Sequence, residues 1–130
     1  MADKGLDFGT IIAGTPSSVQ PTDPGAAQFH VGGLVMAATY ANLQLPTTLT
    51  KVGGGASMPV SFCALCGMYR LNNTNPVGAT AFNPNSGFSG LALTLFTTVY
   101  IWVGGTANPP AAQAPGSYTG TMVLTIGLLL

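Results

Sequence analysis

The sequence predicts an all-β protein, either a sandwich or a barrel, and two observations indicate this. Eighteen Gly and ten Pro residues separate short runs rich in Val, Ile, Thr, Leu and aromatic residues, which is the spacing of short strands joined by turns. Glu is absent, and no segment joins a capping residue to a sustained 3.6-residue apolar repeat, so helices are not expected. With 130 residues, we expect one domain over residues 1–130 with a buried core.

The end of the chain has the clearest strand pattern. After the turn signal Pro115-Gly116, apolar side chains recur at every second position, broken by Gly120: Tyr118, Met122, Leu124, Ile126, Leu128 and Leu130. The opposite face is small and rich in threonine. An apolar face must pack on a core, and an unpaired strand edge is a template for another chain. We therefore expect this long strand to pair with another copy of the protein.

The remaining elements follow from the positions of the turn residues. We expect strands over 6–12, 26–31, 34–45, 47–52, 57–63, 91–95 and 99–103, an irregular or edge segment over 15–25, and a proline-rich connector over 108–114. In the first strand Leu6, Phe8, Thr10 and Ile12 share one face. The third is expected to break near Ala37-Ala38. The polar stretch 70–89 is expected to be the longest exposed loop.

Charge is scarce, which narrows the classes of function. Charged residues make up 5% of the chain and the net charge is zero, so nothing attracts it to nucleic acid or to an anionic membrane. A neutral surface gives little protection against association, which favours a protein packed against its neighbours. The apolar runs are shorter than a membrane-spanning helix needs. No signal peptide is recognisable at the start, so we expect either a cytosolic protein or a mature secreted form, and favour the second.

Few side chains are suited to acid–base chemistry. The chain has one His, three Asp and no Glu, and it lacks the G-x-S-x-G pattern of a nucleophile elbow. His30 lies in an expected strand, and a structural role is favoured for it. The glycines 53–55 are not followed by Lys and a helix, so they indicate a turn and not a phosphate-binding loop. We expect neither an enzyme nor a bound cofactor or metal.

Cys63-Ala-Leu-Cys66 is the sharpest short motif. In an extended strand these cysteines would lie about 10 Å apart, too far for a disulfide, so a bridge requires a tight bend at Ala64-Leu65. A local disulfide, two free buried thiols, and a metal or intersubunit bridge all remain open. Asn72-Asn73-Thr74 matches an N-glycosylation site, but an ordinary asparagine turn is the favoured interpretation.

Several motifs together resemble one family. They are Leu6-Asp-Phe-Gly-Thr-Ile11, then Tyr40-Ala-Asn-Leu-Gln-Leu-Pro46 followed by Gly53-Gly-Gly-Ala-Ser-Met58, and finally Val103-Gly-Gly-Thr106 with Gln113-Ala-Pro-Gly-Ser-Tyr-Thr-Gly120. Their order resembles bacterial secreted immunoglobulin-like domains that carry only an unknown-function label. That family is similar to the spore coat protein U domain and to the archaic chaperone–usher pilins.

The resemblance implies an immunoglobulin-like Greek-key β-sandwich at the cell surface, lacking a final strand that a neighbouring subunit completes. It implies a pilus-like or coat subunit whose partners are identical subunits, with a periplasmic chaperone and an outer-membrane usher as further candidates. The residues expected to share strands are Leu6, Phe8, Ile12, Met122, Leu124, Ile126 and Leu128. Pilin relatives carry a longer segment before the first motif than Met1–Gly5. Either Leu6–Ile12 is itself donated, or subunits join differently, or the donor segment is missing here.

A second class of function stays open. A monomeric, secreted, adhesin-like or carbohydrate-binding sandwich would use the loop between Asn72 and Ser89 and a surface Trp102. Aromatic side chains that alternate along a strand more often form its two faces than a sugar platform.

Overall fold

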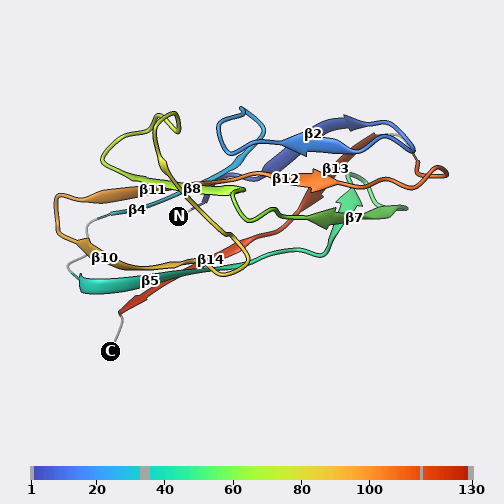
Figure 1. Cartoon of the computed structure of the whole chain (residues 1–130). Helices are drawn as coiled ribbons and strands as arrows, with labels where there is room; N and C mark the ends of the chain where they lie inside the picture. The colour runs from blue at the N-terminus through green and yellow to red at the C-terminus, as the bar shows by residue number, and fades with distance from the viewer. Residues whose placement is uncertain (1, 33–35, 115, 129–130) are drawn as a thin grey trace.

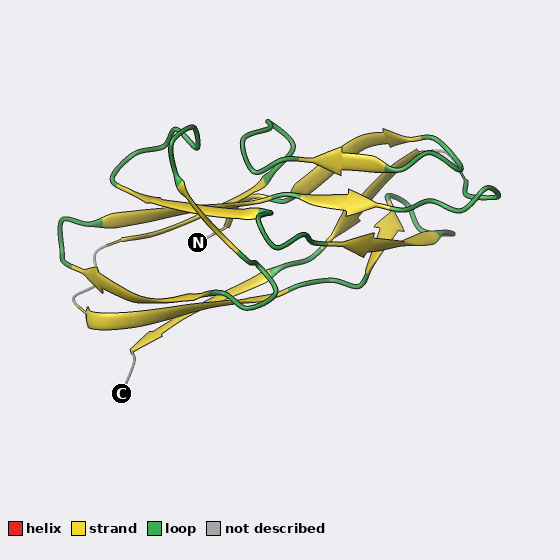
Figure 2. Ribbon diagram, viewed as in Figure 1, coloured by secondary structure: helices red, strands yellow, loops and turns green. Residues whose placement is uncertain are grey.

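The computed structural model of the chain describes residues 2–32, 36–114 and 116–128, and this part contains antiparallel strands and no helix (Figure 2). The all-β prediction is confirmed. The strands are β1 (Ala2–Lys4), β2 (Leu6–Ile11), β3 (Ser17–Val19), β4 (Ala27–Gly32), β5 (Met36–Gln44), β6 (Thr48–Lys51), β7 (Ser57–Ser61), β8 (Gly67–Leu71), β9 (Thr80–Phe82), β10 (Phe88–Leu93), β11 (Thr98–Val103), β12 (Gly105–Ala107), β13 (Gly116–Gly120) and β14 (Val123–Leu128).

The strands form a two-layered half and a curled half. In the first, the five-stranded sheet β1-β4-β11-β8-β9 lies over the three-stranded sheet β10-β5-β14, and Figure 1 shows these as two layers. The other half is the six-stranded sheet β2-β13-β6-β7-β12-β3, whose two outer strands contact each other. The chain passes between the halves six times: from β1 to β2, β3 to β4, β5 to β6, β7 to β8, β11 to β12 and β13 to β14.

One hydrophobic core runs through both halves. The inward faces of the strands supply it, for example Ile101 from β11, Leu49 from β6 and Tyr118 from β13, all fully buried. Trp102 is also buried but does not belong to this cluster, because it alternates with Ile101 along β11 and therefore points to the other face of the sheet.

The first predicted strand has a different inward residue at its end. Leu6 and Phe8 are buried as expected, but Ile12 is 67% exposed and Ile11 is fully buried. The cause is a register shift against β13: Ser117 pairs with Thr10 and Thr119 with Asp7, so β2 carries one extra residue between these rungs. A bulge of this kind reverses the alternation beyond it. Ile12 therefore does not share the inward face of Leu6 and Phe8, as was expected, while its part in strand sharing stays a prediction.

The region 70–89 is not one long loop. Arg70 lies within β8, the short strand β9 follows, and β10 begins at Phe88. Rings anchor the region: the centroids of Tyr69 and Phe88 lie 4.2 Å apart, and those of Phe82 and Phe88 4.9 Å apart. Tyr69 and Phe82 belong to the five-stranded sheet and Phe88 to the three-stranded sheet, so this aromatic cluster joins the two layers. Only 72–79 and 83–87 are loop.

The other boundaries differ in smaller ways. The expected strand over 34–45 is seen as β5 without a break at Ala37-Ala38, while residues 34 and 35 lie outside the described residues. The expected long final strand is two strands, β13 and β14, separated at Thr121-Met122. Leu129 and Leu130 also lie outside the described residues, as does the side chain of Leu128. Four short strands, β1, β8, β9 and β12, were not predicted, and β3 lies in the segment expected to be irregular or an edge.

Candidate functional site

One side of the two-layered half is open between β1 and β14. β14 pairs with β5 from Val123 opposite Gln44 to Leu128 opposite Thr39. It is the outer strand of its sheet, and no strand among the described residues lies along its other edge. β1 is likewise the outer strand of the facing sheet. Two sheet edges therefore face the same side of the molecule without a strand between them.

The open side begins where two paired segments diverge. β2 pairs with β13 down to Leu6 opposite Gly120. On the N-terminal side of Leu6, the chain crosses at Gly5 to the five-stranded sheet, where β1 pairs with β4. On the C-terminal side of Gly120, the chain continues into β14, which pairs with β5. Gly5 belongs to no strand, and a Cβ atom built on it would meet nothing within 4 Å.

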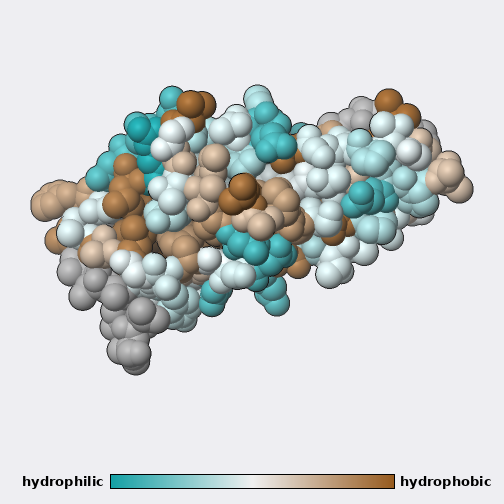
Figure 3. All heavy atoms as spheres, in the orientation of Figure 1, coloured by the Kyte–Doolittle hydropathy of each residue, from teal (hydrophilic) through white to brown (hydrophobic). Residues whose placement is uncertain are grey.

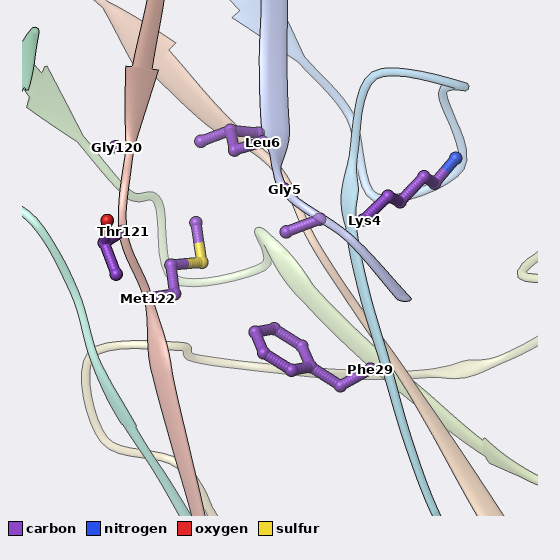
Figure 4. Close-up of a pocket in the computed structure, with 8 residues that line it drawn as sticks. Lys4, Gly5, Leu6, Phe29, Gly120, Thr121 and Met122 are labelled. Atoms are coloured by element: carbon purple, nitrogen blue, oxygen red, sulfur yellow. The ribbon is translucent and has the colours of Figure 1, made fainter. Parts of the chain in front are cut away.

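A cavity of about 230 Å³ lies at the point of divergence. Its lining residues come from the β1–β2 junction, β4 and the β13–β14 junction: Lys4, Gly5, Leu6, Ala27, Phe29, Gly120, Thr121 and Met122. Figure 4 shows the side chains of Leu6, Phe29 and Met122 directed towards one another from three different segments. Lys4 is the one charged residue in this lining, and most of the other lining residues are apolar or glycine. The cavity is therefore suited to binding apolar side chains and not to acid–base chemistry.

The side chains of β14 divide as the alternation predicted. Met122, Leu124 and Ile126 are half-buried and pack against the core, whereas Val123 and Thr125 are exposed. The core therefore covers the inward face of β14 only in part. Of the other residues expected to share strands, Leu6 lines the cavity and Phe8 is buried in the core. Phe29 and Gly5 were missed. The alternation of Ala27, Phe29 and Val31 could have indicated the first, but nothing in the sequence marks Gly5.

Cys63 and Cys66 form a disulfide, with their Cα atoms 5.0 Å apart. The bend at Ala64-Leu65 makes this distance possible: the backbone amide of Cys66 donates to the carbonyl of Cys63 at 3.2 Å. The carbonyl of Cys66 in turn accepts from the amide of Gly104 at 2.8 Å. The bridge thus closes the turn between β7 and β8 and holds it to the start of β12.

We expect removal of this disulfide to have a modest effect. Because the bridge closes a loop with a sequence separation of 3, the chain-entropy model assigns it about 2 kcal/mol. The double variant Cys63→Ser/Cys66→Ser should lose about that much of its free energy of unfolding in urea. Wild-type protein unfolded in the presence of a thiol reductant is the control and should match the variant. An unchanged midpoint in both would contradict the role given to the bridge.

Two other candidate residues have structural roles. Asn72 has a positive φ of 57°, and its Oδ1 accepts from the amide of Thr98 at 2.8 Å while its own amide donates to the Thr98 carbonyl at 2.7 Å. These bonds fit an asparagine turn, and glycosylation there stays a prediction. Trp102 is only 3% exposed, so the surface Trp102 on which the alternative carbohydrate-binding interpretation depended is wrong.

Residues 2–32, 36–114 and 116–128 also lack two other kinds of feature. No group of three His, Cys, Asp or Glu side chains there is arranged to hold a metal ion. The same residues include no helix that is long and apolar enough to cross a membrane.

The fold and the site define a class of protein: an antiparallel β-sandwich with one side open at two neighbouring sheet edges. The chain belongs to the family described as "Domain of unknown function (DUF4402)", whose model matches residues 1–127. Comparisons with curated proteins and with solved structures gave no match.

Proposed function

We propose that the protein is a structural subunit of an extracellular filament or surface coat, assembled when an extended segment of one subunit fills the open side of the next. The observation that supports this most is the open side itself, where the edge of β14 and the cavity at Met122 adjoin. An added strand gains backbone hydrogen bonds from the edge, and alternate side chains fill the apolar cavity.

A contact of Tyr118 supports an immunoglobulin-like, Greek-key sandwich as the underlying fold. Its hydroxyl donates to the carbonyl of Ala114 at 2.6 Å and accepts from Nε2 of Gln113 at 2.8 Å. A buried tyrosine bonded to backbone a few residues upstream, at the corner before a strand, is the tyrosine corner of such folds. The strand that follows this corner here is β13, which leads directly to the free edge of β14.

The surface also supports an assembled state. Large apolar side chains reach solvent in several places, and Figure 3 shows apolar patches between the hydrophilic ones. The exposed residues of this kind are Ile12, Val52, Leu65, Leu71, Val77, Leu95, Phe96 and Val123. With charged residues at 5% of the chain, little repulsion opposes contact between copies. A chaperone that covers the β14 edge before assembly is a fitting partner.

The disulfide supports the proposed location. Disulfides persist in oxidising environments such as the periplasm and the cell surface, and Cys63 and Cys66 are bridged. We therefore place the assembled protein outside the cytoplasm.

Electron microscopy and light scattering of the purified protein test the proposal. We expect fibres or large assemblies to form as the concentration rises, because each copy offers an acceptor to the next. A protein that stays monomeric and monodisperse at high concentration, with and without added seeds, would contradict it.

A further inference from the structure

The free edge of β14 offers a position for a strand from a second copy. We call this position, beside β14 on the side away from β5, the β14 edge site. We propose that the incoming strand occupies the β14 edge site in line with β2, and that β1 leaves this site open because it crosses at Gly5 to pair with β4. This inference rests on the proposed function and adds the position of the partner's strand and the segment that controls access to it.

The register of β2 defines the β14 edge site. In the β2–β13 ladder Gly120 lies opposite Leu6. If the chain continued straight, the same antiparallel register would place Lys4 opposite Met122 and Ala2 opposite Leu124. Instead Lys4 lies opposite Gln28 and Ala2 opposite Phe29 on β4. Residues 2–4 therefore have two geometrically available edges, and the structure shows them on the one that leaves β14 open.

Side-chain contacts hold β1 on β4. The carboxylate of Asp3 accepts from Nδ1 of His30, with distances of 2.7 and 2.8 Å to its two oxygens. Nζ of Lys4 donates to the carbonyl of Pro24 at 2.7 Å. The β1–β4 ladder itself is short and has a register irregularity between Ala2 and Lys4. These two contacts add to the backbone pairing of this short ladder.

Gly5 is placed to act as the turning point between the two edges. The 230 Å³ cavity lies on one side of the β1–β2 junction. A second, more polar hollow of about 400 Å³, lined in part by Asp7, Ser117 and Thr119, also includes Lys4, Gly5 and Leu6. Because both hollows adjoin Gly5 and a Cβ atom built on it would meet nothing within 4 Å, Gly5 can change direction at little steric cost.

The lining of the β14 edge site defines the chemistry of the incoming strand. Its first inward-facing side chain meets Leu6, Phe29 and Met122, and the next ones meet the half-buried Leu124 and Ile126. The partner segment is therefore an extended stretch of a second copy with uncharged, apolar residues at every second position. Lys4 is the one charged residue in the lining of the cavity, and its Nζ already bonds the Pro24 carbonyl, so a charged side chain facing inward would be costly to bury.

Two engineered disulfides test the inference by fixing β1 on one edge or the other. Lys4→Cys/Gln28→Cys joins residues that lie opposite each other on β1 and β4. Lys4→Cys/Met122→Cys joins residues that both line the cavity and would hold β1 in the β14 edge site. We expect the first cross-linked protein to assemble like the wild type. We expect the second to lose assembly while oxidised and to regain it on reduction.

The controls separate the two proposals. The single variants Lys4→Cys and Met122→Cys, and wild-type protein with the same reductant, account for the substitutions and for loss of the natural disulfide. Two outcomes would overturn this inference when the wild type assembles: the Lys4–Met122 cross-link has no effect, or the Lys4–Gln28 cross-link blocks assembly. Either would show that the β14 edge site is misplaced, while the proposed strand sharing would still stand. If the wild type does not assemble, the proposed function fails and this inference falls with it.

Discussion

The substitution Leu124→Asp is expected to abolish assembly. Leu124 is half-buried on the inward face of β14 and packs against the core. An incoming strand would cover it completely, and an aspartate buried there would have no partner of opposite charge. The isolated subunit should also lose about 1–3 kcal/mol of its free energy of unfolding. Electron microscopy of the assembled fraction and urea unfolding of the monomer measure the two effects.

Thr125→Asp is the matched control, because it introduces the same charge on the same strand. Thr125 is exposed on the opposite face of β14, so both the stability and the assembly of this variant should remain close to those of the wild type. Assemblies of normal amount and shape from Leu124→Asp would show that the β14 face is not where subunits meet.

Replacing Tyr118 is expected to cause the largest loss of stability in the subunit. The ring is fully buried in the core, and the hydroxyl bonds Gln113 and the carbonyl of Ala114. Tyr118→Ala should cost about 3–5 kcal/mol through the cavity it leaves. Tyr118→Phe keeps the ring but leaves two polar groups without their partner, and should cost about 1–3 kcal/mol.

Urea unfolding followed by tryptophan fluorescence measures both variants, since Trp102 is buried and the chain has one Trp. Ser117→Ala, at the neighbouring exposed position, is the control and should change the free energy of unfolding by less than about 0.5 kcal/mol. If Tyr118→Phe were as stable as the wild type, the hydroxyl would have no part in fixing the corner before β13.

The inward faces of most strands could be predicted from the sequence because side-chain alternation is a local property. Leu6 and Phe8 in β2, and Met122, Leu124 and Ile126 at the end of the chain, face the core as predicted. The strand ends were also predictable where Gly or Pro residues mark them. The bend at Ala64-Leu65, which a disulfide required, is present.

What the sequence did not reveal depends on contacts between distant segments. Ile12 was misplaced because the bulge in β2 is visible only in its register with β13. The strands within 67–82 were hidden because polar turn residues surround them, whereas the packing of Phe82 and Phe88 fixes them in the fold.

Only one of the two parts of the candidate site could be predicted from the sequence. Periodicity marked the inward face of β14, but the cavity beside it forms only because β1 pairs with β4. A three-residue strand next to a glycine carries no period that could indicate which edge it joins.

Hydrogen–deuterium exchange at the backbone amides of β14, compared between monomer and assembly, tests strand sharing most directly. In a strand, successive amides point to opposite edges, so those of β14 that point away from β5 have no strand to bond in the described subunit. These amides should exchange quickly in the monomer and become strongly protected in the assembly. Equal exchange of the same amides in both states would contradict the account.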